Sequence, residues 1–492
     1  MGGFMQTQVM IVGAGPVGLT LACELARYGV RVRIVDKAAQ RTDKSKALVL
    51  WSRSLELMDR GIGTRQFRET GFNVQAANFI SGEKLVGRVD MGTVDSPYPY
   101  AMMIPQSETE RLLEERLQEL GVTVERSVEA TAIADEGDGT RTTLKGPNGR
   151  EEEVLADWLV GCDGAHSIVR HSLGATFDGE TNESDWMLGD VHMTGYPVPD
   201  TEASIYWHRD GAFIIFPITP GRYRVIADLP ASGEAAPPTP TLDKVQAIID
   251  RRGPGNLKAF DPIWLAGFRI NGRKVSKYRW GRAFLAGDAA HIHSPAGGQG
   301  MNTGMQDAFN LAWKLALVVR GTCREELLDS YSPERSYVGD QVLKSSGALT
   351  TVGTLRNPIA QTLRDVVGHL MLGLTTVQHA FADNMTMVTV GYPDSPLNGP
   401  SLRGAGPKPG HRLPPIAGQI TPGSGTNPQF VLLAEPSAAI TALIKQFGGL
   451  VDATLGTPPR DGGIWLIRPD GYVACTSSDA NAVDDYMRKL AP

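Results

Sequence analysis

Three glycines near the start of the chain have the spacing Gly13-x-Gly15-x-x-Gly18. In such a turn the first glycine allows a tight bend, the second lets the backbone approach a pyrophosphate, and the third permits close packing of a helix on a strand. The free N–H groups and the dipole at the start of that helix favour a negatively charged group. The turn therefore predicts dinucleotide binding, with contacts from Gly13, Gly15, Pro16, Val17 and Gly18.

An acidic residue at the end of the next predicted strand supports this interpretation. Asp36 lies 18 residues after Gly18, close to the roughly 20 residues expected of an acid that binds a ribose. Lys37 follows it directly and is also expected to contact the cofactor. Another kind of α/β protein could contain such glycines, but the strand before them, the helix after them and the acid together favour a dinucleotide.

A second group of residues suited to chemistry lies about 270 residues further on, in AFLAGDAAHIHSPAGGQGMN (283–302). Asp288 ends a predicted strand, where its carboxylate can accept hydrogen bonds from a polyol chain. The glycines that follow offer unhindered N–H groups before a helix predicted from about 305 to 319, and such groups stabilise an anionic reduced ring system. A nicotinamide enzyme has no need of this second loop, so the two motifs together predict FAD.

The elements that position these motifs follow from hydrophobic periodicity and capping residues. Strands are predicted over 7–12 and 30–35, with a helix from about 16 to 28 between them and Gly29 as its C-cap. Two more helices are predicted over 52–60, with Ser52 as N-cap, and over 107–120, with Ser107 as N-cap and Glu110 in the capping box. This order of strands and helices predicts a Rossmann-like α/β domain.

The middle of the chain has a different pattern. Short alternating runs such as EASIYWH and AFIIFPI, separated by turn residues, predict an antiparallel sheet. The predicted domains are a discontinuous FAD-binding domain with a helical extension (1–178 and 266–390), an inserted substrate-binding sheet (179–265), and a linker with a C-terminal domain (391–492). The first domain must be discontinuous, because Asp288 returns to the cofactor that the glycine turn begins to hold.

Composition narrows the class of protein. With 41% hydrophobic and 21% charged residues the chain can bury several cores. The net charge of −6 disfavours nucleic acid and anionic membranes as partners. Four cysteines without a CxxC pair predict a reducing, cytoplasmic location and no zinc site. His291 and His293 are two residues apart, but no further ligands lie near them, so no metal is expected.

The sequence resembles the class A flavoprotein aromatic hydroxylases, in the phenol and polyketide hydroxylase branch of the para-hydroxybenzoate hydroxylase fold. Three segments carry the resemblance: the GxGxxG turn, GCDGAHSIVR (161–170) and GDAAHIHSPAGGQGMNTGMQDAFNLAWKL (287–315). The last is the most specific. The resemblance implies a Rossmann-like FAD-binding domain with an inserted antiparallel β-sheet domain and a C-terminal thioredoxin-like domain.

The resemblance also implies roles for individual residues. Asp36 would bind the adenosine ribose, where the family more often has glutamate, and Asp288 would bind the ribityl chain. The pair Asp163-Gly164 resembles a motif associated with FAD and the nicotinamide cofactor. Residues implied to lie near the flavin are Lys46, Arg53, Gln106, Pro295, Gly298, Gly300, Met301 and Asn302, of which Pro295, Gly298 and Arg53 are the candidates nearest the chemistry.

The reaction implied by the family uses NAD(P)H to reduce FAD, and O₂ to form a flavin C4a-hydroperoxide that hydroxylates a phenolic or polyketide-like aromatic. Water must be excluded from that site. The expected substrate-pocket residues are Trp51, Tyr206, Trp207, Phe213, Ile215, Phe216 and Pro217. Because side chains alternate along a strand, only about half of those on the sheet can face the pocket. The sequence identifies no catalytic base, and a Baeyer–Villiger or inactivating oxidation, or a non-catalytic sensor of aromatic ligands, are the alternatives.

The C-terminal segment resembles the thioredoxin-like appendage of the phenol hydroxylase branch, on the basis of PGHRLP (409–414) and IWLIRPDGYV (464–473). Its single cysteine, Cys475, excludes dithiol redox chemistry. A packing role or a contact in a homodimer is expected for this domain.

Overall fold

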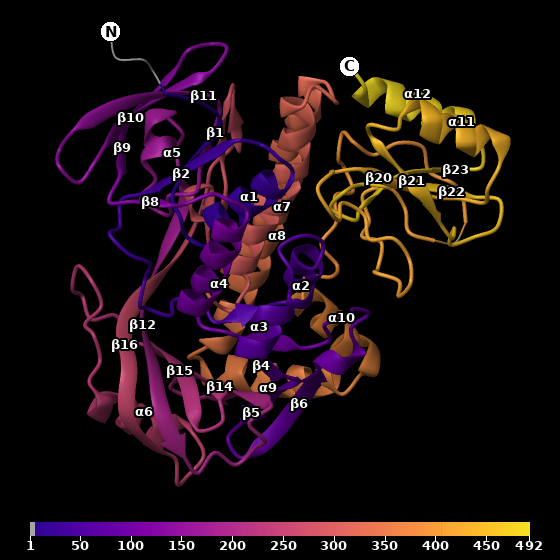
Figure 1. The fold of residues 1–492 in the computed structure, drawn as a ribbon. Coiled ribbons are helices and arrows are strands. Elements are labelled where there is room, and N and C mark those ends of the chain that lie inside the picture. The colour runs from indigo at the N-terminus through magenta and orange to yellow at the C-terminus, as the bar shows by residue number, and fades with distance from the viewer. Residues whose placement is uncertain (1–4, 405) are drawn as a thin grey trace.

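The computed structural model describes residues 5–404 and 406–492 (Figure 1). One sheet has the order β17-β18-β11-β1-β2-β8, with β10 and β9 added beside β11. From β18 to β8 the neighbours along this path are parallel. The strands are β1 (Met5–Val12), β2 (Val32–Asp36), β8 (Glu125–Arg126), β9 (Glu129–Asp135), β10 (Thr140–Lys145), β11 (Glu151–Gly161), β17 (Arg279–Trp280) and β18 (Ala283–Leu285).

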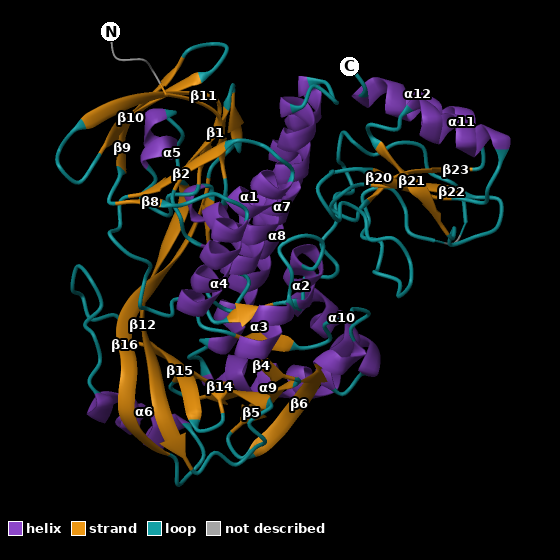
Figure 2. Ribbon diagram, in the orientation of Figure 1, coloured by secondary structure: helices purple, strands orange, loops and turns teal. Residues whose placement is uncertain are grey.

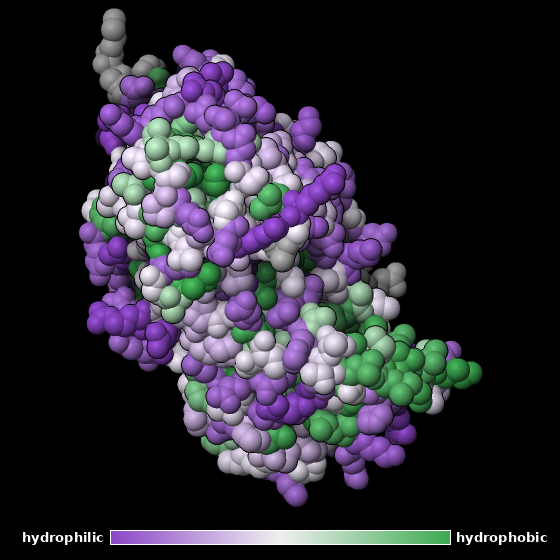
Figure 3. Space-filling model, turned by 90° about the vertical axis from the view of Figure 1, so that its right-hand side faces the viewer, coloured by the Kyte–Doolittle hydropathy of each residue, from purple (hydrophilic) through white to green (hydrophobic). Residues whose placement is uncertain are grey.

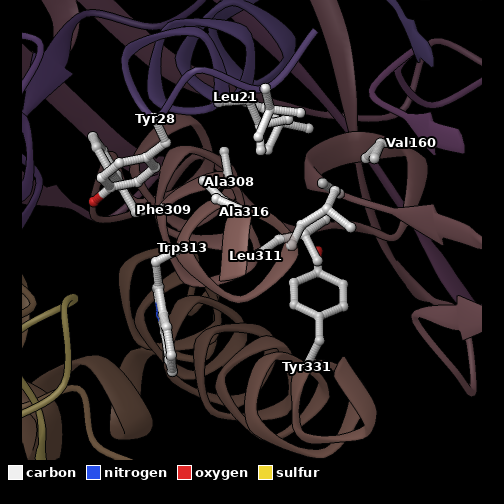
Figure 4. Packing of buried hydrophobic residues seen from close by; sticks show 14 of the residues in the cluster. Leu21, Tyr28, Val160, Ala308, Phe309, Leu311, Trp313, Ala316 and Tyr331 are labelled. Carbon is white, nitrogen blue, oxygen red and sulfur yellow. The ribbon is translucent and has the colours of Figure 1, made fainter. Parts of the chain in front are cut away.

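Helix α7 (Gly300–Val319) is the central support of this domain. It packs on α1 (Pro16–Arg27), which in turn packs on α4 (Gln106–Glu119). Figure 4 shows Ala308, Leu311 and Ala316 of α7 within the cluster that also holds Leu21 of α1 and Val160 of β11. The α7 residues from Asn302 to Leu317 are all buried. One side of the helix is apolar, whereas its polar side chains, among them Asn302, Asp307 and Lys314, have partners inside the protein.

A second sheet has the order β19-β16-β12-β15-β14-β13-β5-β6 and is antiparallel except for the pair β13–β5. Figure 2 shows it in the lower half of the molecule, below the central helices. Helix α6 (Leu242–Arg252) packs on one of its faces. The strands are β5 (Ala76–Ser81), β6 (Lys84–Asp90), β12 (Asp178–Thr194), β13 (Glu202–His208), β14 (Gly211–Thr219), β15 (Arg222–Leu229), β16 (Lys258–Lys274) and β19 (His291–Ile292).

This sheet extends beyond the predicted domain 179–265. Strands β5 and β6 join it from the N-terminal part of the chain, through the parallel pairing of β13 with β5. Beside it lies a small sheet of β3 (Val49–Leu50), β7 (Ala101–Met103) and β4 (Phe72–Val74). The remaining helices of this half of the chain are α2 (Ser52–Met58), α3 (Arg65–Thr70), α5 (Ile168–Ser172), α8 (Tyr331–Gly353), α9 (Pro358–Leu372) and α10 (Thr375–Met385).

The C-terminal domain contains a four-stranded sheet of order β21-β20-β22-β23. Strands β20 and β21 are parallel and are connected by a helix, whereas β22 and β23 continue the sheet antiparallel, as in a thioredoxin-like fold. The elements are β20 (Phe430–Leu433), α11 (Ala438–Gln446), β21 (Val451–Gly456), β22 (Ile464–Ile467), β23 (Val473–Ser477) and α12 (Ala480–Leu490).

The predicted helices are present, but three of their starts differ. Helix α2 has Trp51 as N-cap, because the Ser52 hydroxyl donates to the Tyr98 carbonyl instead of capping. Helix α4 begins at Gln106, so Ser107 lies inside its first turn. Helix α7 begins at Gly300, five residues before the predicted start, because its first turn is part of the glycine loop. None of the described helices is long and apolar enough to span a bilayer.

Candidate active site

The glycine turn has the geometry that a pyrophosphate contact requires. Gly13 has φ +102°, and a side chain there would collide with the Cys162 carbonyl. A side chain at Gly18 would collide with the Gly13 carbonyl. Around Gly15, in contrast, an added Cβ would meet no atom within 4 Å. Two glycines thus serve the fold, whereas the open side of Gly15, at the N-terminus of α1, leaves room for an anion.

Asp36 is joined directly to this turn. Its carboxylate accepts hydrogen bonds from the backbone N–H of Ala14 at 2.7 Å and of Ala38 at 2.8 Å. Lys37, next to it, is exposed. Val17 packs against the positions of Gly287 and Gly304, where an added Cβ would crowd its side chain. The first motif therefore contacts the second, which begins at Gly287, across the start of α1.

Asp288 has the surroundings of a ligand-binding carboxylate. It lies in the short 3-10 turn Gly287–Ala289 that follows β18, its residue is exposed, and no hydrogen bond or ion pair to the described residues engages its side chain. The surrounding protein raises its pKa by desolvation, and the nearby charges of His291 and Lys46 oppose that rise. A recessed carboxylate with open hydrogen-bonding capacity fits the hydroxyls of a ribityl chain.

The glycine loop after Asp288 is braced from inside. Gly297 and Gly298 have φ +92° and +61°, a conformation that side chains disfavour. The Trp51 indole donates to the Gly297 carbonyl at 3.0 Å. Asn302 accepts from the Trp51 N–H at 2.9 Å and donates to the Val49 carbonyl at 2.8 Å. The loop and the segment 49–51 are thus one rigid unit, with Pro295 exposed at its start.

The other end of that segment is held by Gln106. The Gln106 side-chain carbonyl accepts a hydrogen bond from the Ala47 N–H at 3.1 Å, and the Gln106 backbone N–H donates to the Ala47 carbonyl at 3.0 Å. Lys46, the preceding residue, is exposed, and its charge acts on Asp288. Gln106 therefore positions the chain that presents Lys46. Gly300 and Met301 lie in the first turn of α7, whose free N–H groups border the loop.

The Asp163-Gly164 pair acts within the protein as a brace. The Asp163 carboxylate accepts from the Ser167 hydroxyl and from the Ile168 N–H at 2.7 Å, and burial raises its pKa. Arg170, from the same motif, donates to the Ala289 carbonyl at 3.1 Å. The motif therefore supports the segment next to Asp288.

Arg53 does not border the loop, which corrects its assignment as a flavin-flanking candidate. Its side chain is fully buried, pairs with Glu56 at 3.1 Å and donates to the Asp470 carbonyl at 2.7 Å. It also lies over the Tyr472 ring. Arg53 thus joins α2 to the C-terminal domain, over a sequence separation that no local pattern reveals.

The two histidines of the loop have different partners. His291 Nε2 lies 2.8 Å from Asp307, which also pairs with Arg335 at 2.6 Å. His293 Nδ1 lies 2.8 Å from the Ser294 carbonyl, while Nε2 has no hydrogen-bond partner within the described chain. Burial lowers the pKa of His293 to about 4. Among the described residues no group of three His, Cys, Asp or Glu is placed to hold a metal.

A cavity of about 150 Å³ lies between the glycine loop and the second sheet. Ser294 to Gly298 form one wall, and the opposite wall is the sheet face not covered by α6. Most of its lining is apolar or aromatic, and no Asp, Glu, His, Lys, Arg, Tyr or Cys is among the described residues that line it. Its aromatic lining residues are Trp51, Phe79, Trp186, Trp207, Phe216 and Phe381.

Three of the expected pocket residues, Trp51, Trp207 and Phe216, line this cavity, and four do not. Tyr206 and Phe213 pair across β13 and β14, so their side chains share the opposite face. The four on that face are Tyr206, Phe213, Ile215 and Pro217, and the first three belong to the core beneath α6. Their assignment to the pocket is wrong, because α6 covers that face of the sheet.

The sequence did not reveal the walls contributed by β5 and α10. Phe79 and Phe381 come from these elements and contact each other edge to face, with ring centroids 5.6 Å apart. Trp207, which was expected in the pocket, lines the cavity and has the cavity-facing parity of its strand. The alternation of β13 separates Trp207 from Tyr206, whereas nothing local pointed to α10.

A larger cavity, of about 500 Å³, lies between α8, the end of α10 and residues 387–393. Its lining mixes aliphatic side chains with amides, hydroxyls and the His411 and Arg412 side chains. It touches the glycine loop only through Gln299. The apolar cavity, which follows the loop from Ser294 to Gly298, is therefore the candidate substrate site.

Buried charges join α7 and α8 to the C-terminal domain. Glu334 pairs with Arg468 at 2.6 Å and with Lys314 at 2.7 Å, all three fully buried. Burial alone would raise the pKa of Glu334, but the two cations hold it well below its usual range. Burial lowers the pKa of Lys314 to about 8. Breaking such a pair leaves an uncompensated buried charge, which is strongly destabilising.

Comparison with known proteins identifies the family of this chain. Residues 6–346 match the FAD binding domain family, and the chain belongs to it. It is 37% identical to a 6-methylpretetramide 4-monooxygenase of Streptomyces rimosus, over 95% of this chain and 90% of that protein. It is 35% identical to a rifampicin monooxygenase of Streptomyces venezuelae, over 78% and 79% of the two chains.

The fold has a counterpart among solved structures. An anhydrotetracycline hydroxylase, OxyS, from Streptomyces rimosus superimposes with a TM-score of 0.81 at 30% identity, over 99% of both chains. The Rossmann-like domain, the second sheet and the C-terminal domain are therefore arranged as in that hydroxylase.

Proposed function

We propose that this protein is a single-component flavoprotein monooxygenase that uses FAD, NAD(P)H and O₂ to hydroxylate a phenolic or polyketide-like aromatic substrate. Membership of the FAD-binding family and the monooxygenase relatives support this function. The observation that carries it is the apolar cavity, which has the glycine loop as one wall. A flavin held by that loop would supply the activated oxygen, and the cavity would hold the ring that accepts it.

The glycine turn, Asp36, Asp288 and the loop fit FAD in this role. Gly15 has open space, Asp288 has free hydrogen-bonding capacity, and Gly297 and Gly298 present backbone without side chains. We assign the pyrophosphate to the turn and the ribityl chain to Asp288. Asn302 and Trp51 keep the loop in position through hydrogen bonds to the backbone.

The size and lining of the cavity suit an aromatic ring. Apolar protein cavities of about 150 Å³ stay dry and accept a single benzene ring. The cavity also includes the partly exposed Val352, so a larger fused-ring substrate would extend outward past α8. Excluding water protects a reactive oxygen donor from wasteful decay.

The lining contains one buried donor without a partner. The Trp186 indole N–H has no acceptor among the described residues, and Trp186 is 4% exposed. Leaving such a group unpaired is costly. We propose that it donates to an oxygen atom of the substrate and so orients the ring. Since none of the described lining residues has a titratable side chain, loss of the phenol proton would depend on the substrate itself or on solvent at the cavity mouth.

The test is a screen of phenols and polyketide aromatics for stimulated NAD(P)H oxidation by the FAD-loaded protein, with mass spectrometry of the products. A product one oxygen heavier, with the hydroxyl on the aromatic ring, is the expected result. Oxygen inserted beside a ketone would instead favour a Baeyer–Villiger or inactivating oxidation, the second candidate, which the rifampicin monooxygenase relative supports. Bound flavin without stimulated oxidation by any aromatic would refute both and favour a sensor.

A further inference from the structure

Helix α9 carries a stripe of exposed apolar side chains. Six of them follow one another in steps that keep them on one face of the helix, and Leu374 continues the stripe two residues after the helix ends; each of the seven is 46–81% exposed. Figure 3 shows hydrophobic side chains gathered in one patch that projects from the lower part of the molecule, at the height at which Figure 1 draws α9. We call this set the α9 stripe: Ile359, Leu363, Val366, Val367, Leu370, Met371 and Leu374.

The opposite face of α9 is already occupied by its own chain. Gly368 lies against the Trp207 ring, and Leu372 packs at Gly87 of β6. Arg364 lies over Trp207 with its Cζ atom 4.9 Å from the ring centroid. Helix α9 therefore packs on the sheet through this opposite face, and the exposed stripe takes no part in that packing.

The charged side chains of α9 also point away from the stripe. Arg364 is buried and donates to Asp365 at 2.9 Å, and the Asp365 carboxylate accepts from the Ser81 hydroxyl. Between residues 358 and 377 there is no lysine and no other acidic or arginine residue. A partner on the stripe would therefore bury no unpaired charge, which is the usual cost of covering a helix surface.

We propose that the α9 stripe is the contact surface of a homodimer, in which the stripes of two copies pack against each other about a twofold axis. A twofold interface requires a self-complementary patch, and an uncharged apolar stripe meets that requirement. Its steps of three and four residues allow the side chains of two crossing helices to interdigitate.

The area agrees with this partner. The exposed fractions together equal about four fully exposed aliphatic side chains, on the order of 500 Å² and as large as the largest patch of a typical monomer. A stable dimer buries about 800 Å² per partner, of which about two-thirds is apolar in homodimers. The stripe supplies that apolar share, and the residues around it would form the polar rim.

A membrane surface fits the stripe less well. Helices that lie on anionic lipid carry Lys and Arg beside their apolar face. The only basic residue of this type on α9 is the buried Arg364, and the chain has a net charge of −6. Since two copies carry the same net charge, the dimer should also become more stable as salt screens their repulsion.

Sedimentation velocity on the full-length, FAD-loaded protein tests the proposal. The wild-type protein should sediment as a dimer, and added salt should strengthen it. The double variant Leu363→Glu/Leu370→Glu should be monomeric, with a dissociation constant raised by at least about tenfold, because it places like charges inside the interface. The matched control Ile263→Glu changes another exposed apolar residue, 48% exposed and on β16, and should remain dimeric.

Bound FAD and the far-ultraviolet circular dichroism spectrum should be the same in all three proteins, which shows that the variants are folded; the urea midpoint should be lower only for the double variant, because it lacks the stabilisation that dimerisation gives. A monomeric wild-type protein, or an unchanged dimer in the double variant, would overturn the proposal. So would a monomer that pellets with vesicles of phosphatidylcholine and phosphatidylglycerol, since that result would identify lipid as the occupant. None of these readouts depends on catalytic activity.

Discussion

Replacing Gly15 with alanine separates a residue that serves the cofactor from residues that serve the fold. An added methyl at Gly15 meets no atom within 4 Å, and its backbone, φ −78° and ψ −174°, is open to any residue. Alanine is a poorer N-cap than glycine by up to about 1 kcal/mol, and it stabilises by about 0.4–1 kcal/mol through the unfolded chain. The free energy of unfolding without FAD should therefore change by less than about 1 kcal/mol.

The affinity for FAD should fall much more. The methyl group stands where the pyrophosphate must approach the start of α1, so at least one charge-assisted hydrogen bond from the backbone would be lost. Such a bond is worth about 1.5–3 kcal/mol, which corresponds to roughly a 10- to 100-fold weaker binding of FAD. Quenching of flavin fluorescence on titration of the apoprotein measures the dissociation constant, and urea unfolding of the same apoprotein measures stability.

The matched control is Gly255→Ala, which adds the same methyl group in open space on an exposed loop. It should change neither quantity. If Gly15→Ala bound FAD within twofold of the wild-type protein, the pyrophosphate could not lie at this turn. If the apoprotein instead lost several kcal/mol of stability, the space around Gly15 would not be open, and the distinction from Gly13 and Gly18 would be refuted.

Four further outcomes follow from the site. Asp288→Asn keeps the shape of the side chain but removes its charge, so FAD affinity should fall about 10- to 100-fold by the same titration; unchanged affinity would contradict the ribityl assignment. Ile205→Ala enlarges the cavity and should shift kcat/KM toward bulkier aromatics, whereas the neighbouring Tyr206→Phe, on the face beneath α6, should not; equal effects would argue against this cavity. Trp186→Phe should raise KM by about 2- to 10-fold, the value of one hydrogen bond, with little loss of FAD; an unchanged KM for every substrate would remove its role as donor. Since burial lowers the folded pKa of His293 to about 4, below its unfolded value of about 6.5, stability is fully present above pH 6.5 and decreases as the pH falls toward 4, by at most about 3 kcal/mol. Urea unfolding of His293→Gln across this range should show a weaker pH dependence, and identical curves would contradict the burial of a neutral imidazole.

The sequence could predict the parts of the site that are local in the chain. The turn from Gly13 to Gly18 and Asp36 belong to one βαβ unit, and Asp288 follows a strand of the same sheet. Each of these local sequence patterns therefore predicts where its residues lie in the fold. The choice of sheet face could not be made in this way. Alternation shows that Tyr206 and Trp207 face opposite sides, but only α6, which packs from later in the chain, decides which side is core.

The prediction that Arg53 lies beside the flavin was wrong for a related reason. The family resemblance implied that this basic residue lies near the flavin, yet its partner Asp470 lies 417 residues away in the chain. The cavity walls from β5 and α10 could not be predicted for the same reason, because they depend on how distant segments of the chain pack together. Patterns of a few residues predict secondary structure and local motifs well, whereas contacts over hundreds of residues depend on the whole fold.

The buried ion pair of Glu334 and Arg468 has a consequence for how the protein matures. Arg468 lies 134 residues after Glu334, so a growing chain on the ribosome completes α7 and α8 long before this cation is synthesised. During that interval Lys314 is the only one of the two cations available to Glu334, and the helix that begins at the glycine loop lacks part of its support. Capture of the cofactor should therefore be a late event of biosynthesis, coupled to docking of the C-terminal domain.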